Sequence, residues 1–156
     1  MSGERAEVTI IGVGNSMRRD DGVGPAAIDR LAGIDLGSVD VELITLDGEP
    51  ARLIEAWRSR RRVIMVDAVC SGAPAGSIHR LEYGADPLPE ATTTYSSHGG
   101  GIADAIALAE ALDALPEQLI LMGTESGDLS LGEGLTDEVH ATLPLLVEQI
   151  AAEAIA

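Results

Sequence analysis

The chain has 156 residues, 46% of them hydrophobic, which is enough to bury one core and too short for two ordinary domains. It carries 26 acidic and ten basic residues, for a formal net charge of -16. This balance excludes nucleic acid and anionic membranes as expected partners, because phosphate binding requires Lys and Arg to neutralise it. We therefore expect one domain spanning residues 1–156.

Apolar runs alternate with helical patterns along the chain. In chain order we predict a strand at 8–13, a helix at 25–32, a strand at 41–46, a helix at 51–58, a strand at 63–66, an exposed edge strand at 77–82, a helix at 102–112, a strand at 119–122 and a helix at 136–152 that opens with a capping-box pattern. This alternation predicts an α/β fold, a three-layer α/β/α sandwich with a mostly parallel sheet of about five strands.

The stretch GVGNSMRRDDGVG, residues 12–24, directly follows the first predicted strand. Its glycines suggest a dinucleotide loop, but the G-x-G-x-x-G pattern requires glycine where this chain has Met17, and a Walker loop requires a lysine that the chain lacks. The adjacent Asp20 and Asp21 would also repel phosphate. A nucleotide-binding α/β enzyme is therefore the least favoured hypothesis.

Three polar residues are predicted to meet at one edge of the sheet. Asp21 follows the first strand, Asp67 ends the run VIMVD, and His98 lies in SSHGGG ahead of a helix. Open α/β sheets bind ligands at the carboxyl ends of their strands. Two carboxylates and an imidazole there would form an incomplete first-row metal site with positions open to water or substrate. The alternative interpretation of each residue is a helix cap or turn residue.

The ordered motifs resemble a known family. GVGNSMRRDDGVG at 12–24, LDGEP at 46–50, VDAV at 66–69, SSHGGGIADAIALA at 96–109 and GTESGDLSLGEGLTDEV at 123–139 are similar to the nickel-iron hydrogenase maturation endopeptidases. The resemblance implies a cytoplasmic protease that removes a C-terminal extension from the hydrogenase large-subunit precursor after nickel insertion. The alternative is a nickel-sensing assembly factor that binds the same precursor without cutting it.

The resemblance implies that Asp21, Asp67 and His98 are the metal ligands and catalytic residues. It also implies that nickel is carried by the precursor, with another divalent metal substituting when substrate is absent, so a permanent cofactor is not implied. A metal-polarised carbonyl, a metal-activated water and a carboxylate general base are all compatible with this set. A serine-protease pairing of Ser96 or Ser97 with His98 is disfavoured, because adjacent side chains seldom give the geometry of a nucleophile and its base.

Asn15, Asp47 and Glu125 are accessory candidates at the same mouth, with ordinary turn residues as the alternative. His79 and His140 are interpreted as solvated histidines. The single cysteine excludes an internal disulfide, the opening residues show no secretion signal, and no run reaches the roughly 18 apolar residues of a membrane span. We therefore expect a cytoplasmic protein without membrane association.

Overall fold

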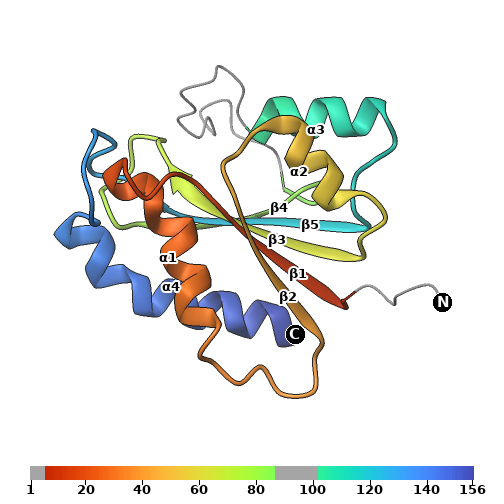
Figure 1. The fold of residues 1–156 in the computed structure, drawn as a ribbon, viewed down its shortest axis with the longest axis horizontal. Coiled ribbons are helices and arrows are strands. Elements are labelled where there is room, and N and C mark those ends of the chain that lie inside the picture. Colours follow the sequence, from red (N-terminus) through yellow and green to blue (C-terminus); the bar gives the residue numbers. More distant parts are fainter. Residues whose placement is uncertain (1–5, 87–101) are drawn as a thin grey trace.

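The computed structural model describes residues 6–86 and 102–156 (Figure 1). Every predicted strand and helix is present within these residues, and a short 3-10 helix, η1, is added to them. The elements in chain order are β1 (Val8–Val13), η1 (Arg19–Gly22), α1 (Val23–Leu31), β2 (Val41–Leu46), α2 (Pro50–Trp57), β3 (Arg62–Val69), β4 (Ile78–Glu82), α3 (Ile102–Ala111), β5 (Gln118–Glu125) and α4 (Asp137–Ile155).

The strands form one five-stranded sheet in the order β2-β1-β3-β5-β4. The first four strands in this order are parallel, and β4 pairs antiparallel with β5 at the edge. The predicted mostly parallel sheet and its edge strand are therefore confirmed. From β1 the chain crosses to β2 on one side and then to β3 on the other, so the direction of strand addition reverses between β1 and β3.

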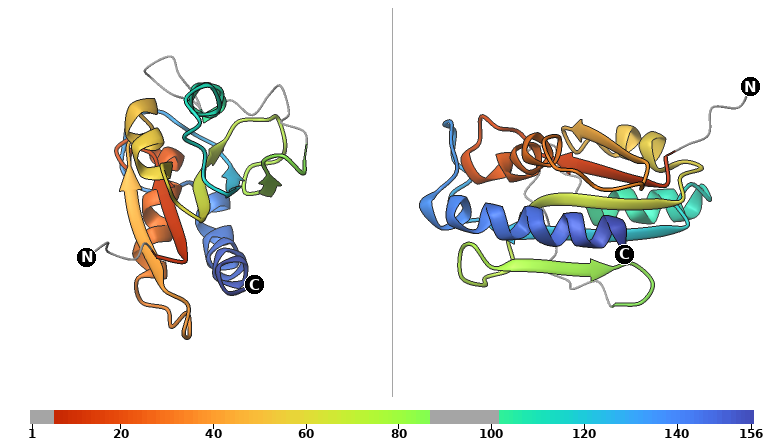
Figure 2. Two further views of the ribbon diagram at one scale, coloured as in Figure 1. Left: turned by 90° about the vertical axis from the view of Figure 1, so that its right-hand side faces the viewer. Right: turned by 90° about the horizontal axis from the view of Figure 1, so that it is seen from below.

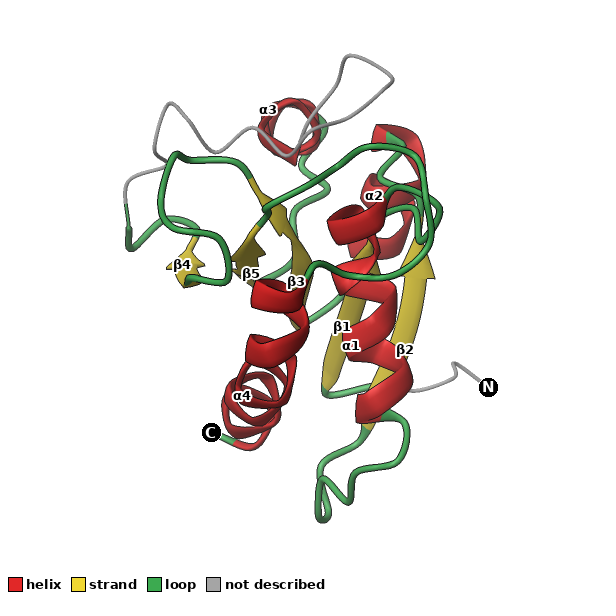
Figure 3. Ribbon diagram, turned by 90° about the vertical axis from the view of Figure 1, so that its left-hand side faces the viewer, coloured by secondary structure: helices red, strands yellow, loops and turns green. Residues whose placement is uncertain are grey.

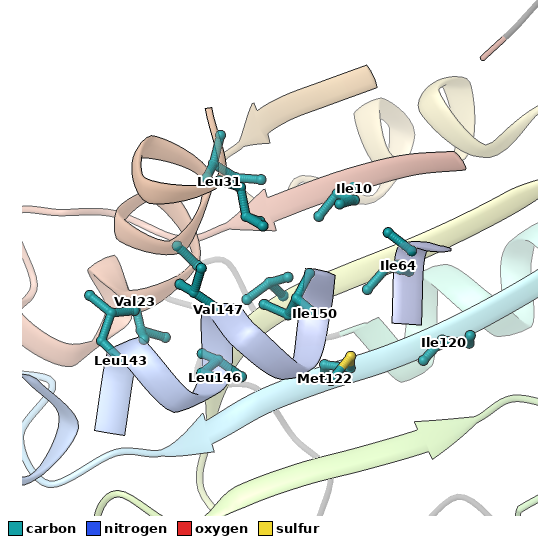
Figure 4. Packing of buried hydrophobic residues seen from close by; sticks show 14 of the residues in the cluster. Ile10, Val23, Leu31, Ile64, Ile120, Met122, Leu143, Leu146, Val147 and Ile150 are labelled. Carbon is teal, nitrogen blue, oxygen red and sulfur yellow. The ribbon is translucent and has the colours of Figure 1, made fainter. Parts of the chain in front are cut away.

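Helices cover both faces of the sheet (Figure 2). Helices α1 and α4 share one hydrophobic cluster with the sheet, and α2 and α3 share a second. Successive residues of β1 serve the two clusters alternately, since Ile10 belongs to the first and Ile11 to the second. Figure 4 shows the first cluster, in which Ile10, Ile64 and Ile120 of three adjacent strands lie close to α4.

The second cluster contains the only tryptophan of the chain. Trp57 is fully buried at the end of α2, and its indole N–H donates a hydrogen bond to the Met65 sulfur at 3.4 Å. Met65 and Asp67 lie two residues apart on β3, so their side chains point to the same face of the sheet. This face of the sheet therefore carries both the second apolar cluster and the candidate site residue Asp67.

Several element ends differ from the sequence predictions, among them β5, which spans Gln118–Glu125, and three further differences concern β3, α1 and the start of α4. Strand β3 continues to Val69, because its pairing with β5 extends to Val69 opposite Glu125, so Asp67 lies inside the strand rather than at its end. Helix α1 begins at Val23, two residues before Pro25. The predicted capping box at Thr136 is wrong: Thr136 is the N-cap residue of α4, but its side chain makes no cap hydrogen bond.

Glycines in the first motif bring helix and sheet backbones together. A Cβ atom on Gly12 would lie 2.5 Å from the Gly24 carbonyl oxygen, and one on Gly24 would lie 2.5 Å from the Val13 carbonyl oxygen and 2.6 Å from that of Val66. These two glycines therefore serve the close packing of α1 on β1 and β3. No helix in the described ranges, 6–86 and 102–156, is both long and apolar enough to cross a membrane.

This packing predicts that Gly24→Ala destabilises the fold by about 1–3 kcal/mol, since the added methyl group meets the backbone of both Val13 and Val66. Gly33→Ala is the matched control, because the nearest atom to its added Cβ is the Arg30 carbonyl oxygen at 3.7 Å. Urea denaturation of both variants measures the difference. Equal stability of the two variants would contradict the packing role of Gly24.

Candidate functional site

Two acidic candidates meet where the order of strand addition reverses. Asp21 lies in η1, just after β1, and Asp67 lies near the carboxyl end of the neighbouring strand β3. Their carboxylates are close enough for the charge on Asp21 to raise the pKa of Asp67. Crevices at such reversal points, outside the carboxyl ends of the strands, are the usual ligand sites of open α/β sheets.

Both carboxyl groups are harder to ionise than in water. Asp67 is 5% exposed, and burial, followed by the Asp21 charge, raises its pKa well above the ordinary value. The Ala68 backbone N–H donates a hydrogen bond to Asp67 Oδ1 at 2.7 Å and opposes this shift. Burial also raises the pKa of Asp21, against a hydrogen bond from the Asn15 N–H at 2.8 Å and the nearby charge of Arg18.

The neighbouring Asp20 has a different role. Its side chain is fully buried and accepts hydrogen bonds from the backbone N–H groups of Gly127, Asp128 and Thr136 at 2.7–3.0 Å, and from the Thr136 hydroxyl. It therefore ties the first motif to the loop between β5 and α4. The sequence shows two adjacent aspartates, but only these long-range contacts show which of them is structural.

The accessory candidates Asn15 and Asp47 take part in local turns. The Asn15 side chain accepts a hydrogen bond from the Met17 N–H, and its own N–H donates to Asp21. Asp47 is exposed and pairs with Arg52, and a hydrogen bond from the Glu49 N–H holds its pKa below the ordinary value. Asn15 therefore supports Asp21 directly, while Asp47 supports the start of α2; a role for either in substrate binding stays a prediction.

Glu125 and His79 form a network beside the acidic pair. Glu125 is 3% exposed at the end of β5 and accepts hydrogen bonds from the Ser71 N–H at 2.8 Å and the Ser71 hydroxyl at 2.5 Å. His79 Nε2 lies 3.1 Å from Glu125 Oε1. Burial acts to raise the pKa of Glu125, but these hydrogen bonds outweigh it and leave the pKa below the ordinary value.

The interpretation of His79 as a merely solvated histidine was wrong, because its ring contacts the buried Glu125 carboxylate. His140 is exposed, as expected.

The third predicted ligand, His98, lies outside the described residues, as do Ser96 and Ser97. Among residues 6–86 and 102–156, no group of three or more His, Cys, Asp and Glu side chains is arranged to hold a metal ion. The described part of the chain therefore supplies two converging carboxylates. The assignment of His98 stays a prediction.

Comparison with known proteins identifies the family. A family model described as hydrogenase maturation protease matches residues 29–153. The chain belongs to the hydrogenase maturation protease family. Membership places it among peptidases, the hydrolases of peptide bonds.

Individual relatives agree with this assignment. The hydrogenase 2 maturation protease of Escherichia coli K12 is 26% identical over 147 residues, which cover 93% of this chain and 88% of the relative. The hydrogenase expression/formation protein HupD of Thiocapsa roseopersicina is 26% identical over 150 residues, which cover 93% of this chain and 68% of the relative. The solved structure of the hydrogenase maturating endopeptidase HybD from E. coli matches with a TM-score of 0.77 at 27% identity, over 94% of this chain and 90% of that one.

The raised pKa of Asp67 predicts a pH-dependent penalty on folding. Because the folded-state pKa lies above the unfolded value, ionising Asp67 costs stability as pH rises from about 4 towards neutral. Asp67→Asn keeps an acceptor for the Ala68 N–H, so we expect it to be more stable than wild type at pH 7 and equal to it below about pH 4. Urea denaturation midpoints across this pH range measure the difference in stability between Asp67→Asn and wild type. Asp47→Asn is the control: because the pKa of Asp47 is lowered, we expect this variant to be less stable than wild type at pH 7. A stability difference between Asp67→Asn and wild type that does not change with pH would contradict the raised pKa of Asp67.

The Asp20 contacts predict that Asp20→Ala destabilises the protein by about 2–4 kcal/mol, because buried N–H donors lose their acceptor. Asp128→Ala, which removes hydrogen bonds to Ser130 in the same loop and an exposed charge near Arg19, is expected to cost much less stability. Calorimetry distinguishes the two variants. A similar small loss for both would mean that Asp20 does not hold the two loops together.

Proposed function

We propose that the chain is the endopeptidase that removes the C-terminal extension of a nickel-iron hydrogenase large-subunit precursor after nickel has entered it. The observation that carries this proposal is the convergence of Asp21 and Asp67 at the reversal point of the sheet. Membership of the hydrogenase maturation protease family supplies the substrate class. The protein would act in the cytoplasm, where we expect it from its sequence.

The electrostatics of the pair support a cationic substrate centre. Burial raises the pKa of both carboxyl groups, and the charge on Asp21 raises the pKa of Asp67 further, so ionising both groups is costly. A divalent cation placed between them removes this cost, and oxygen ligands suit first-row divalent ions. Precursor that carries nickel would thus satisfy the pair, while nickel-free precursor would leave it uncompensated.

In this proposal the nickel belongs to the substrate. Asp21, Asp67 and His98 engage it and thereby align the scissile peptide beside them, so immature precursor is not cut. Another divalent ion would occupy the same carboxylates when the precursor is absent. Peptide hydrolysis then needs a water positioned against the scissile carbonyl, a task that a carboxylate can serve as general base.

The test is to incubate the protein with nickel-loaded and nickel-free precursor and to measure the precursor mass. We expect loss of one C-terminal peptide from the loaded form alone. Binding without a change in mass would instead support the assembly-factor alternative. Cleavage of both forms at equal rates would contradict nickel gating.

Single substitutions at the three residues are expected to abolish processing without unfolding the protein. The variants are Asp21→Asn, Asp67→Asn and His98→Ala, each examined by circular dichroism and by the mass assay. Asp35→Asn serves as the control, because Asp35 lies on an exposed loop where its side chain accepts only a local hydrogen bond from Gly37. Wild-type rates in any of the three variants would remove that residue from the site.

A further inference from the structure

The acidic pair has a neighbour on the same face of the sheet. Asp67 on β3 pairs with Gly123 on β5, and Gly123 pairs in turn with His79 on β4. Residues directly opposite one another on adjacent strands project to the same face. Asp67 and His79 therefore project to the face of α2 and α3, separated by a single position without a side chain. Figure 3 shows β3, β5 and β4 side by side.

Glu125 holds the imidazole of His79 in place. The Glu125 carboxylate is itself fixed by two hydrogen bonds from Ser71, and it lies 3.1 Å from His79 Nε2. A carboxylate accepts hydrogen bonds, so the neutral ring places its proton on Nε2 and leaves Nδ1 as an acceptor. No partner for Nδ1 is found among the described residues, and the His79 side chain is 36% exposed.

We propose that His79 is a specificity-determining residue of this peptidase. Its Nδ1 accepts a hydrogen bond from a donor of the bound precursor, and Glu125 is the positioning residue that orients the imidazole. The proposal rests on the proposed function, since it places a further part of the same precursor on the sheet face that carries Asp67. It adds a contact that the acidic pair does not make.

The register of the sheet sets the distance of this contact from the cut. Two strand spacings of about 4.8 Å separate Asp67 from His79, or about 10 Å in all. An extended peptide rises about 3.3 Å per residue, so one crossing the carboxyl ends of β3 and β5 and the amino end of β4 covers this distance in about three residues. His79 therefore contacts the precursor about three residues from the scissile bond.

Two substitutions distinguish a substrate contact from a structural role. The amide of glutamine can reach the place of Nε2 and donate to Glu125, while asparagine offers an acceptor oxygen near the place of Nδ1. We expect His79→Gln to keep wild-type stability yet lose about tenfold in kcat/KM, and His79→Asn to retain more activity than His79→Gln. His140→Ala, at an exposed histidine of α4, is the control and is expected to behave as wild type.

Precursor variants map the position of the contact. Once the cut site is known from the mass of the wild-type product, each residue within five positions of it is replaced in turn by alanine, which removes a side-chain donor, and by proline, which removes the backbone N–H. In wild type one position about three residues from the cut is expected to show a loss that disappears in His79→Gln.

The outcomes separate the two proposals. If the wild-type protein does not cut nickel-loaded precursor, the proposed function fails. If the wild type cuts but His79→Gln cuts equally well, or the order of the glutamine and asparagine variants is reversed, His79 serves only to hold Glu125 and the further inference is overturned. Coupling confined to the residues that flank the cut also overturns it.

Discussion

The site depends on one buried carboxylate that is not part of it. Asp20 binds the N–H groups of Gly127, Asp128 and Thr136, and so joins the loop after β1 to the loop after β5 across the edge of the sheet. Since Asp21 follows directly in the chain, the same contacts fix the backbone that presents Asp21 to Asp67. Two chemically identical neighbours thus differ in role: Asp20 satisfies backbone donors, and Asp21 is the one that we propose binds a cation.

The residues that stabilise this fold lie apart from the residues of the candidate site. Two apolar clusters, one on each face of the sheet, stabilise the domain, and the parallel strands between them bring their carboxyl ends to one edge. An ionised carboxylate at the position of Asp67 opposes folding, and the apolar clusters offset that cost. A buried ionisable group that lowers stability is typical of functional sites, where the group interacts with a ligand.

The sequence predicted the elements of this fold because long apolar runs and helical periodicity are strong local signals. It missed the end of β3 because Asp67 interrupts an apolar run, although pairing with β5 continues past it to Val69. It predicted that Asp21 and Asp67 lie at one edge of the sheet, because both were expected near the carboxyl ends of strands. It did not predict the contact of His79 with Glu125, which lies 46 residues away, because that contact is set by antiparallel register, a long-range property.

The buried tryptophan gives the protein an optical probe of its own. Trp57 donates a hydrogen bond to the Met65 sulfur, and Met65 shares a face of β3 with Asp67, so the single indole of the chain lies on the same face of the sheet as the site. A cation that settles against Asp67 changes the electric field on this face. Under the proposed function, the emission of Trp57 is therefore expected to change when a cation binds at Asp67, without an added label.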